Sequence, residues 1–158
     1  MNLILWRHAE AEDSNSRGDM ARELTKRGRK QAQQMAHWLE AHLEGEWRLV
    51  VSPARRTLQT VEPLGRQFEV RDALAPGTFP GKVLREAGWP DAPTNVLLVG
   101  HQPTLGEVAA LLLRGEEGGV SIRKGAIWWF VTRDREGKME TTLKTVLEPD
   151  QAEDQEIP

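Results

Sequence analysis

The chain has 158 residues, of which 39% are hydrophobic and 28% are charged, and its formal net charge is −3. This balance is typical of one globular domain and provides no positive field for binding nucleic acid. The absence of cysteine excludes disulfides, thiol catalysis and cysteine-bound zinc. No segment has the roughly 18 apolar residues of a membrane helix, and the first residues lack a signal-peptide pattern. We therefore expect a cytoplasmic protein that binds neither membranes nor nucleic acid.

The apolar pattern predicts strands that alternate with helices over most of the chain. Short apolar runs bounded by polar residues predict buried strands at residues 2–6, 48–51 and 95–99, and residues 68–70 are expected to form an edge-like strand. An apolar stripe at helical spacing predicts a long helix at residues 26–43, and further helices are expected at residues 54–66, 82–87 and 104–113. Thr25 is a suitable N-cap for the long helix, and Pro63 should interrupt the second one. The polar segment between residues 7 and 22 is expected to form a loop.

The C-terminal part of the chain has a different pattern. Residues 126–132 and 139–146 predict two strands joined by a polar turn, which is a hairpin signal. Residues 149–158 are acidic and have little to bury, so we expect a disordered tail. The chain therefore predicts one domain over residues 1–148. Its expected architecture is a three-layer α/β/α fold with a mostly parallel sheet and a C-terminal antiparallel hairpin.

Polar side chains follow three of the predicted buried strands. Arg7 and His8 follow the first strand, Arg55 and Arg56 lie shortly after the second, and His101 follows the fourth. Ligands of open α/β sheets bind beyond the carboxyl ends of the parallel strands, so these side chains should lie together. Guanidinium groups bind phosphoryl oxygens in a bidentate manner, and a neutral imidazole can attack phosphorus. The pattern predicts a phosphoryl-transfer site in which His8 is the nucleophile.

Four segments in the same order resemble the motifs of the histidine phosphatase superfamily. Residues 5–9 are similar to its Arg-His signature, and residues 22–28 to its Arg-x-Leu-Thr-x-x-Gly segment. Residues 52–60 are similar to its second arginine motif, and residues 100–101 to its second histidine motif. The short length further resembles the SixA-type phosphohistidine phosphatases of that superfamily. The resemblance implies a phosphoglycerate mutase-like fold.

The resemblance also implies roles for individual residues. His8 would be the residue that becomes phosphorylated, and Arg7 and Arg56 would bind phosphate oxygens. His101 would hydrogen-bond the phosphoryl group and carry a proton, and Arg22 would contribute to substrate binding. The activity would need neither a metal nor another cofactor. The expected ligands are phosphate and a phosphorylated protein, for example a signalling domain that carries phosphohistidine.

Two adjacent arginines compete for the second motif position. The spacing from Ser52 to Gln59 selects Arg56 rather than Arg55. On a helix the two side chains would point about 100° apart, so they should not perform the same task.

No residue is an obvious general acid. Larger members of the superfamily carry a mid-chain carboxylic acid that protonates the leaving alcohol, whereas residues 72–78 contain only Asp72. Glu10, Glu12 and Asp72 remain candidates, and the chain can also lack such an acid. A phosphorylated imidazole leaves through a weaker P–N bond and depends less on an acid. This favours phosphohistidine on a protein over the alternative substrates, which are small phosphate esters.

Other interpretations of the sequence are weaker. A zinc site would need grouped histidines, but His37 and His42 would point about 140° apart on their helix. A non-catalytic phosphate-binding module would not need both His8 and His101. A nucleotide-binding protein would carry a Gly-rich loop after the first strand, which is absent. The basic residues at positions 26–30 are either a solvated helix face or a docking surface for an acidic partner.

Overall fold

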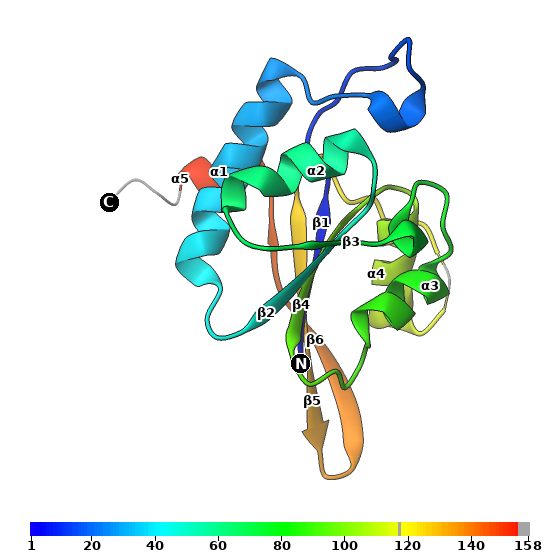
Figure 1. The fold of residues 1–158 in the computed structure, drawn as a ribbon. Helices are drawn as coiled ribbons and strands as arrows, with labels where there is room; N and C mark the ends of the chain where they lie inside the picture. The colour runs from blue at the N-terminus through cyan, green and yellow to red at the C-terminus, as the bar shows by residue number, and fades with distance from the viewer. Residues whose placement is uncertain (117, 155–158) are drawn as a thin grey trace.

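The fold is built on one six-stranded sheet. The computed structural model describes residues 1–116 and 118–154. The strands are in the order β3-β2-β4-β1-β5-β6 (Figure 1). The first four of these pair in parallel, and β5 and β6 are antiparallel, as predicted. The strand bounds are β1 Asn2–Arg7, β2 Trp47–Val51, β3 Glu69–Val70, β4 Asn95–Gly100, β5 Ile127–Arg135 and β6 Lys138–Leu147.

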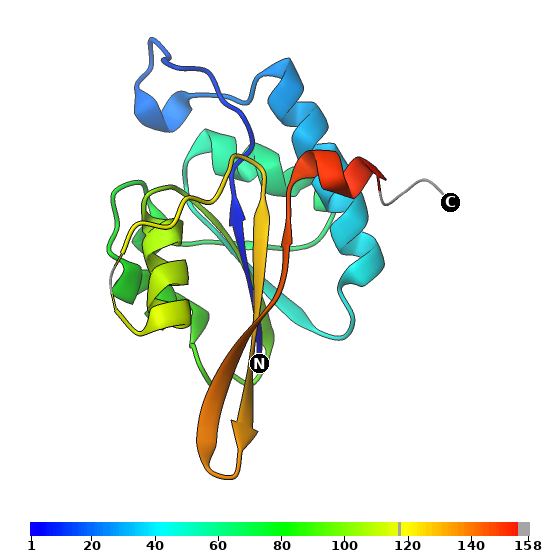
Figure 2. The same ribbon diagram turned by 180° about the vertical axis from the view of Figure 1, so that it is seen from behind.

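Helices cover both faces of the sheet, which confirms the three-layer prediction. One face carries α1, α2 and α5, and the other carries α3 and α4 (Figures 1 and 2). None of the described helices is long and apolar enough to cross a bilayer. The helix bounds are α1 Lys26–His42, α2 Arg55–Val61, α3 Pro80–Ala87, α4 Thr104–Arg114 and α5 Pro149–Asp154.

Strand β1 shows why a continuous apolar run predicts a central strand. Side chains alternate across a strand, so its apolar residues serve two cores. Ile4 and Trp6 pack in the core under α1 and α2, whereas Leu3 and Leu5 pack in the core under α3 and α4. All four side chains are fully buried. The strand therefore has no solvent-facing side, and its carboxyl end is held rigidly where the site lies.

The start of α1 is fixed by its sequence in the way predicted. Thr25 caps the helix, because its hydroxyl oxygen accepts a hydrogen bond of 3.0 Å from the backbone N–H of Gly28. Gly28 itself lies against the carbonyl oxygen of Glu10, where a Cβ atom would collide. A glycine is required here, because the first turn of α1 packs directly on the segment that follows His8. The predicted break at Pro63 is also present, since α2 ends at Val61 and continues as a short 3₁₀ turn.

The expected disordered tail is wrong for residues 149–154. These residues form helix α5, which packs on α1, and Ala152 is fully buried in the core. The acidic composition hid this contact, because in the described part of the segment only two residues, Pro149 and Ala152, are buried. Residues 155–158 lie outside the described part of the chain.

Replacing Ala152 by aspartate should lower the free energy of unfolding by about 1–3 kcal/mol, because it buries a carboxylate among apolar side chains. The exposed neighbour Asp150 provides the control, and Asp150→Ala should change the value by less than about 0.5 kcal/mol. Urea denaturation measures both variants. Equal stabilities for Ala152→Asp and the parent protein would mean that α5 does not dock in solution.

Candidate active site

The carboxyl ends of three parallel strands meet at one edge of the sheet. His8 follows β1, Ser52 follows β2, and His101 follows β4. The backbone N–H of His8 donates to the carbonyl oxygen of Gly100 over 3.2 Å, and that of Ser52 donates to Val99 over 3.1 Å. The imidazole rings of His8 and His101 lie 5.4 Å apart between their centroids. The predicted convergence of the two histidines is therefore confirmed.

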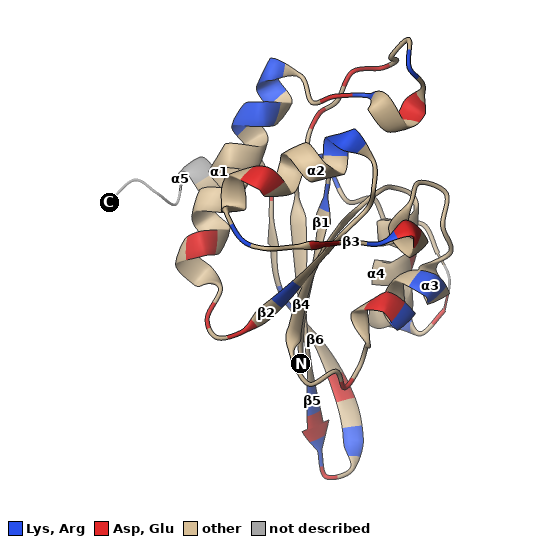
Figure 3. Ribbon diagram, in the orientation of Figure 1, with Lys and Arg blue, Asp and Glu red and all other residues tan. Residues whose placement is uncertain are grey.

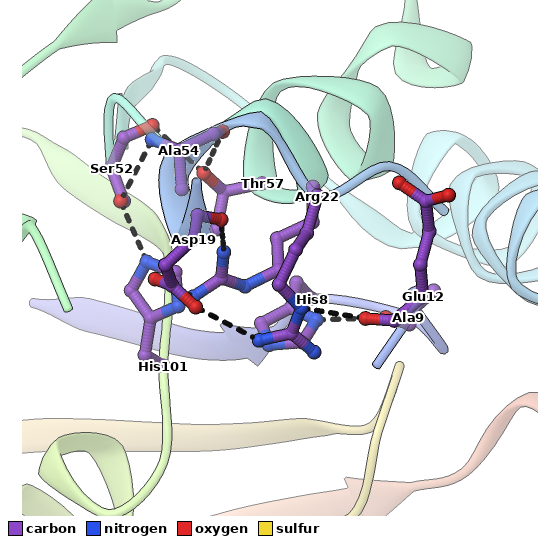
Figure 4. A network of polar contacts seen from close by, with 10 residues as sticks. His8, Ala9, Glu12, Asp19, Arg22, Ser52, Ala54, Thr57 and His101 are labelled. Atoms are coloured by element: carbon purple, nitrogen blue, oxygen red, sulfur yellow. Dashed lines mark hydrogen bonds and ion pairs between the residues drawn. The ribbon is translucent and has the colours of Figure 1, made fainter. Parts of the chain in front are cut away.

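A backbone contact fixes which nitrogen of His8 carries the proton. The Nδ1 atom lies 2.7 Å from the carbonyl oxygen of Ala9 (Figure 4). A carbonyl oxygen can only accept, so Nδ1 carries the hydrogen. In the neutral ring, Nε2 therefore keeps its lone pair. Ala9 is held in turn by Thr60, whose hydroxyl oxygen accepts from the Ala9 N–H and donates to the carbonyl oxygen of Arg56.

The surroundings of His8 keep its ring neutral. Burial lowers its pKa to about 4, and the positive charges of Arg56, Arg7 and Arg22 act in the same direction. The hydrogen bond to Ala9 opposes this shift without reversing it. At neutral pH the ring is an unprotonated base, which is the form that can attack phosphorus.

Titration of the free protein should show the same behaviour. Because its pKa is lowered to about 4, the His8 ring should stay neutral from pH 8 down to about pH 5 and gain its proton only below that. Nitrogen NMR of the imidazole rings measures the pKa and the tautomer together, and His8→Ala identifies the signal. A His8 ring that titrates near its ordinary value of 6.5, or one protonated on Nε2, would contradict the site as described.

His101 is held in a different way. Its Nε2 and the hydroxyl of Ser52 are joined by a hydrogen bond of 2.7 Å, and that hydroxyl also accepts from the N–H of Ala54. Burial, together with the neighbouring His8 and Arg56, lowers the pKa of His101 to about 3. The protonated His101 that the resemblance implies is therefore not what the protein alone adopts. A phosphate dianion beside the ring would raise this pKa again.

Arg56 and Arg55 differ as the motif spacing predicts. The Arg56 side chain is only 5% exposed, and its two terminal nitrogens contact Asp19. The Arg55 side chain is 51% exposed and lies 3.6 Å from a carboxylate oxygen of Glu23. Only Arg56 therefore belongs to the buried site.

Arg7 and Arg22 are each held by a backbone carbonyl oxygen. A terminal nitrogen of Arg7 donates to the carbonyl oxygen of Ile122 over 2.9 Å. Arg22 donates from Nε to the carbonyl oxygen of Glu12 over 2.6 Å and contacts a carboxylate oxygen of Asp19 over 3.1 Å. Both guanidiniums contribute to the lowered pKa of His8, so both act electrostatically at the nucleophile.

Unpaired polar atoms gather at this site. In the described part of the chain, four buried side-chain nitrogen or oxygen atoms have no hydrogen-bond partner. Three of them are Nε of Arg7, Nε of Arg56 and Nδ1 of His101. Such atoms are costly to bury, so a cluster of them indicates a ligand that supplies acceptors. An oxyanion such as a phosphoryl group fits this requirement.

The three candidate acids do not join this cluster. Glu10 accepts a hydrogen bond from the Thr25 hydroxyl over 2.8 Å. Glu12 accepts from the side chain of Asn15 and from the backbone N–H of Glu23, so it holds the loop together. Asp72 begins a 3₁₀ turn after β3 and is exposed.

The carboxylate that does reach the site is Asp19, which the sequence analysis missed. It lies in a 3₁₀ turn within the predicted loop and bridges the guanidiniums of Arg22 and Arg56. Its position three residues before Arg22 is the one signal that could have found it, because residues at that spacing face each other in a helical turn.

Gln59 shows why the second arginine motif extends past Arg56. Its side-chain oxygen accepts from the backbone N–H of Leu24 over 2.7 Å, and its nitrogen donates to Glu23 over 3.1 Å. Helix α2 thus carries the buried arginine and also fastens the segment that presents Arg22.

Among the described residues, no three histidine or carboxylate side chains are grouped as metal ligands. His42, one of the histidines considered for zinc, stacks on Trp38 with ring centroids 3.9 Å apart.

A mixed α/β sheet that presents two neutral histidines, the buried Arg56 and the partly buried Arg7 near its strand ends fits a phosphatase type of site. The comparisons with known proteins agree with that class. Residues 3–77 match the histidine phosphatase superfamily (branch 1). The phosphohistidine phosphatase SixA homologue of Haemophilus influenzae is 32% identical over 127 residues, which cover 71% of this chain and 77% of that protein. This chain belongs to the histidine phosphatase superfamily.

Two further relatives support the assignment. Phosphohistidine phosphatase SixA of Escherichia coli is 31% identical over 124 residues, which cover 73% of this chain and 76% of that protein. The structure of the protein histidine phosphatase SixA complexed with tungstate superposes with a TM-score of 0.76 at 28% identity. That superposition covers 95% of this chain and 98% of the other. The chain is therefore a phosphatase with a SixA-like fold.

Proposed function

We propose that the protein is a metal-independent phosphatase that removes the phosphoryl group from phosphohistidine on another protein. The observation that carries this proposal is the neutral His8 with its proton on Nδ1, which lies beside His101 and feels the charges of Arg7 and Arg56. Each of these three neighbours has a buried nitrogen without a hydrogen-bond partner. A nucleophile and a set of oxyanion donors are the two parts that phosphoryl transfer requires.

The proposed first step is attack by the Nε2 lone pair of His8 on phosphorus. The bond from phosphorus to the substrate nitrogen breaks, and its electron pair stays on the leaving imidazole. The new phosphohistidine keeps its proton on Nδ1, where Ala9 accepts the hydrogen bond. Arg7, Arg22, Arg56 and His101 would stabilise the charge on the phosphoryl oxygens.

In the second step, water attacks the phosphorus atom bound to His8. The P–Nε2 bond breaks, its electron pair returns to Nε2, and the water leaves with both of its protons as part of a dihydrogen phosphate ion, which then releases one proton to solvent at neutral pH. The ring is thereby restored to the neutral tautomer with its proton on Nδ1. No metal or organic cofactor takes part in either step.

Two observations support a protein substrate. The similar SixA proteins are named as phosphohistidine phosphatases, and one was solved with tungstate, a tetrahedral oxyanion. Exposed basic residues also lie together along the start of α1, at the end of the molecule that carries the site (Figure 3). We include in the proposal that this surface, Lys26, Arg27, Arg29 and Lys30, docks an acidic phosphorylated domain in the cytoplasm.

The test compares a histidine-phosphorylated signalling domain with a panel of small phosphate esters. The proposal predicts a kcat/KM at least about tenfold higher for the phosphoprotein, because an alkoxide without acid assistance leaves more slowly. A preference for the esters would replace the proposal with an ester phosphatase. A single burst of label on His8 without further turnover would indicate a binding module instead.

A further inference from the structure

Asp19 is a carboxylate in direct contact with two arginines of the site, Arg22 and Arg56. One of its carboxylate oxygens lies 3.1 Å from a terminal nitrogen of Arg22, and the other lies 3.2 Å from a terminal nitrogen of Arg56. Its backbone oxygen also accepts from Arg56 over 2.8 Å. Figure 4 shows its side chain between Arg22 and His101. The preceding Gly18 has a φ of +105°, which other residues rarely adopt, so the chain is shaped to make this turn.

The carboxylate is fixed and charged. The hydrogen bond from Arg22, followed by the charge of Arg56, keeps the pKa of Asp19 below its ordinary value. It is therefore an anion at neutral pH and cannot donate a proton to a leaving group. Any chemical role must come from its ability to accept a hydrogen bond or to attract a positive charge.

The contacts with the arginines do not use all of the hydrogen-bond acceptor positions of the Asp19 carboxylate. A carboxylate has about four acceptor positions, and one contact to each guanidinium uses two of them. The Asp19 side chain is 56% exposed, whereas that of Arg56 is 5% exposed. Asp19 therefore lies on the solvent side of Arg56. A leaving group attached to a protein must also depart towards solvent, so it would pass this carboxylate.

We propose that Asp19 is a specificity-determining residue, whose carboxylate accepts the N–H of the substrate imidazole as its other nitrogen leaves phosphorus. The inference rests on the proposed function and names the leaving group that the site selects. A phosphorylated imidazole with a proton on its distal nitrogen can leave as a neutral ring. The P–N electron pair goes to the leaving nitrogen, the distal proton stays in place, and the positive charge passes to the newly phosphorylated His8.

In this arrangement the imidazole rings of His8 and of the substrate each donate an N–H to an acceptor of the protein. The N–H of His8 donates to the carbonyl oxygen of Ala9, and the N–H of the substrate ring would donate to Asp19. An anionic acceptor raises the pKa of the bound substrate ring, so more of it stays protonated above neutral pH. A leaving group without an N–H, such as a phenol or an aliphatic alcohol, gains nothing from Asp19.

The experiment compares two substrates on Asp19→Asn, which removes the charge at similar size. Phosphoimidazole has a leaving group with an N–H, and 4-nitrophenyl phosphate has one without. We expect Asp19→Asn to lower kcat for both substrates by different factors. The factor for phosphoimidazole should be about tenfold or more larger than the factor for 4-nitrophenyl phosphate. With phosphoimidazole, the alkaline decline in kcat should also move to lower pH in Asp19→Asn. Asp13→Asn, an exposed aspartate in the same loop, is the matched control and should behave like the parent protein.

Each other result has a definite meaning. An equal fall in the kcat of Asp19→Asn on both substrates would show that Asp19 only positions Arg22 and Arg56, and would overturn the inference. No loss on either substrate, or tighter phosphate binding with faster turnover, would overturn it as well. Parent protein that hydrolyses neither phosphoimidazole nor a histidine-phosphorylated protein would contradict the proposed function itself. Thermal unfolding of Asp19→Asn shows whether the variant is folded, so a loss of structure cannot be mistaken for the selective effect.

Discussion

His8→Ala should reduce turnover by on the order of 10⁴-fold or more. The alanine removes the only atom of the protein that bonds to phosphorus in the proposed mechanism, so the covalent route closes entirely. The arginines and His101 would remain, and they would still bind phosphate and polarise it for slow attack by water. Phosphate affinity should therefore change far less than kcat, and steady-state kinetics with a direct phosphate-binding measurement separates the two.

The control for this variant is another histidine of the same chain. His37 is exposed on α1, away from the strand ends, so His37→Ala should keep the parent rate. His8 is buried, and thermal unfolding of His8→Ala must show that the variant is folded. A folded His8→Ala protein with the parent turnover would exclude His8 as the nucleophile.

Arg56→Ala should lower kcat/KM by about 10²–10³-fold, because it removes a buried guanidinium from the charge that develops on the phosphoryl oxygens. Arg55→Ala should lower it by no more than about threefold, since that side chain lies at the surface beside Glu23. The pair is closely matched, because the two residues are adjacent on the same turn of α2 and lose the same atoms.

A lysine at position 56 sharpens this comparison. Arg56→Lys keeps the positive charge but loses the planar fork that contacts Asp19 through two nitrogens. The fall in kcat/KM of Arg56→Lys should be larger than that of Arg55→Ala and smaller than that of Arg56→Ala. Equal losses in Arg55→Ala and Arg56→Ala would contradict the assignment of Arg56 to the site.

Much of the fold could be predicted because its central strands are buried on both faces. Residues 2–6 and 95–99 have no polar interruption, and such runs indicate interior parallel strands. Once those strands are placed, the rule that ligands bind at their carboxyl ends brings His8 and His101 together. The choice of Arg56 over Arg55 required a further argument, which is that neighbouring residues on a helix point about 100° apart. The structure confirms each of these placements.

Other features depend on contacts that have no local pattern. Helix α5 docks through Ala152, and nothing near that residue distinguishes it from a disordered acidic segment. The protonation of His101 depends on how deeply the fold buries it and on the charges around it. Asp19 lies in an irregular polar loop, so its contacts with two arginines distant from each other in sequence emerge only in three dimensions.

The central claim is that His8 becomes phosphorylated during turnover. Rapid mixing of the protein with a phosphorylated substrate, followed by quenching in alkali and mass spectrometry, detects an acid-labile phosphoryl group directly. We predict that the group appears on the peptide containing His8, reaches a steady level during turnover and disappears when substrate is exhausted. Phosphoryl transfer to another residue, or turnover with no protein-bound phosphoryl group at any time, would contradict the account.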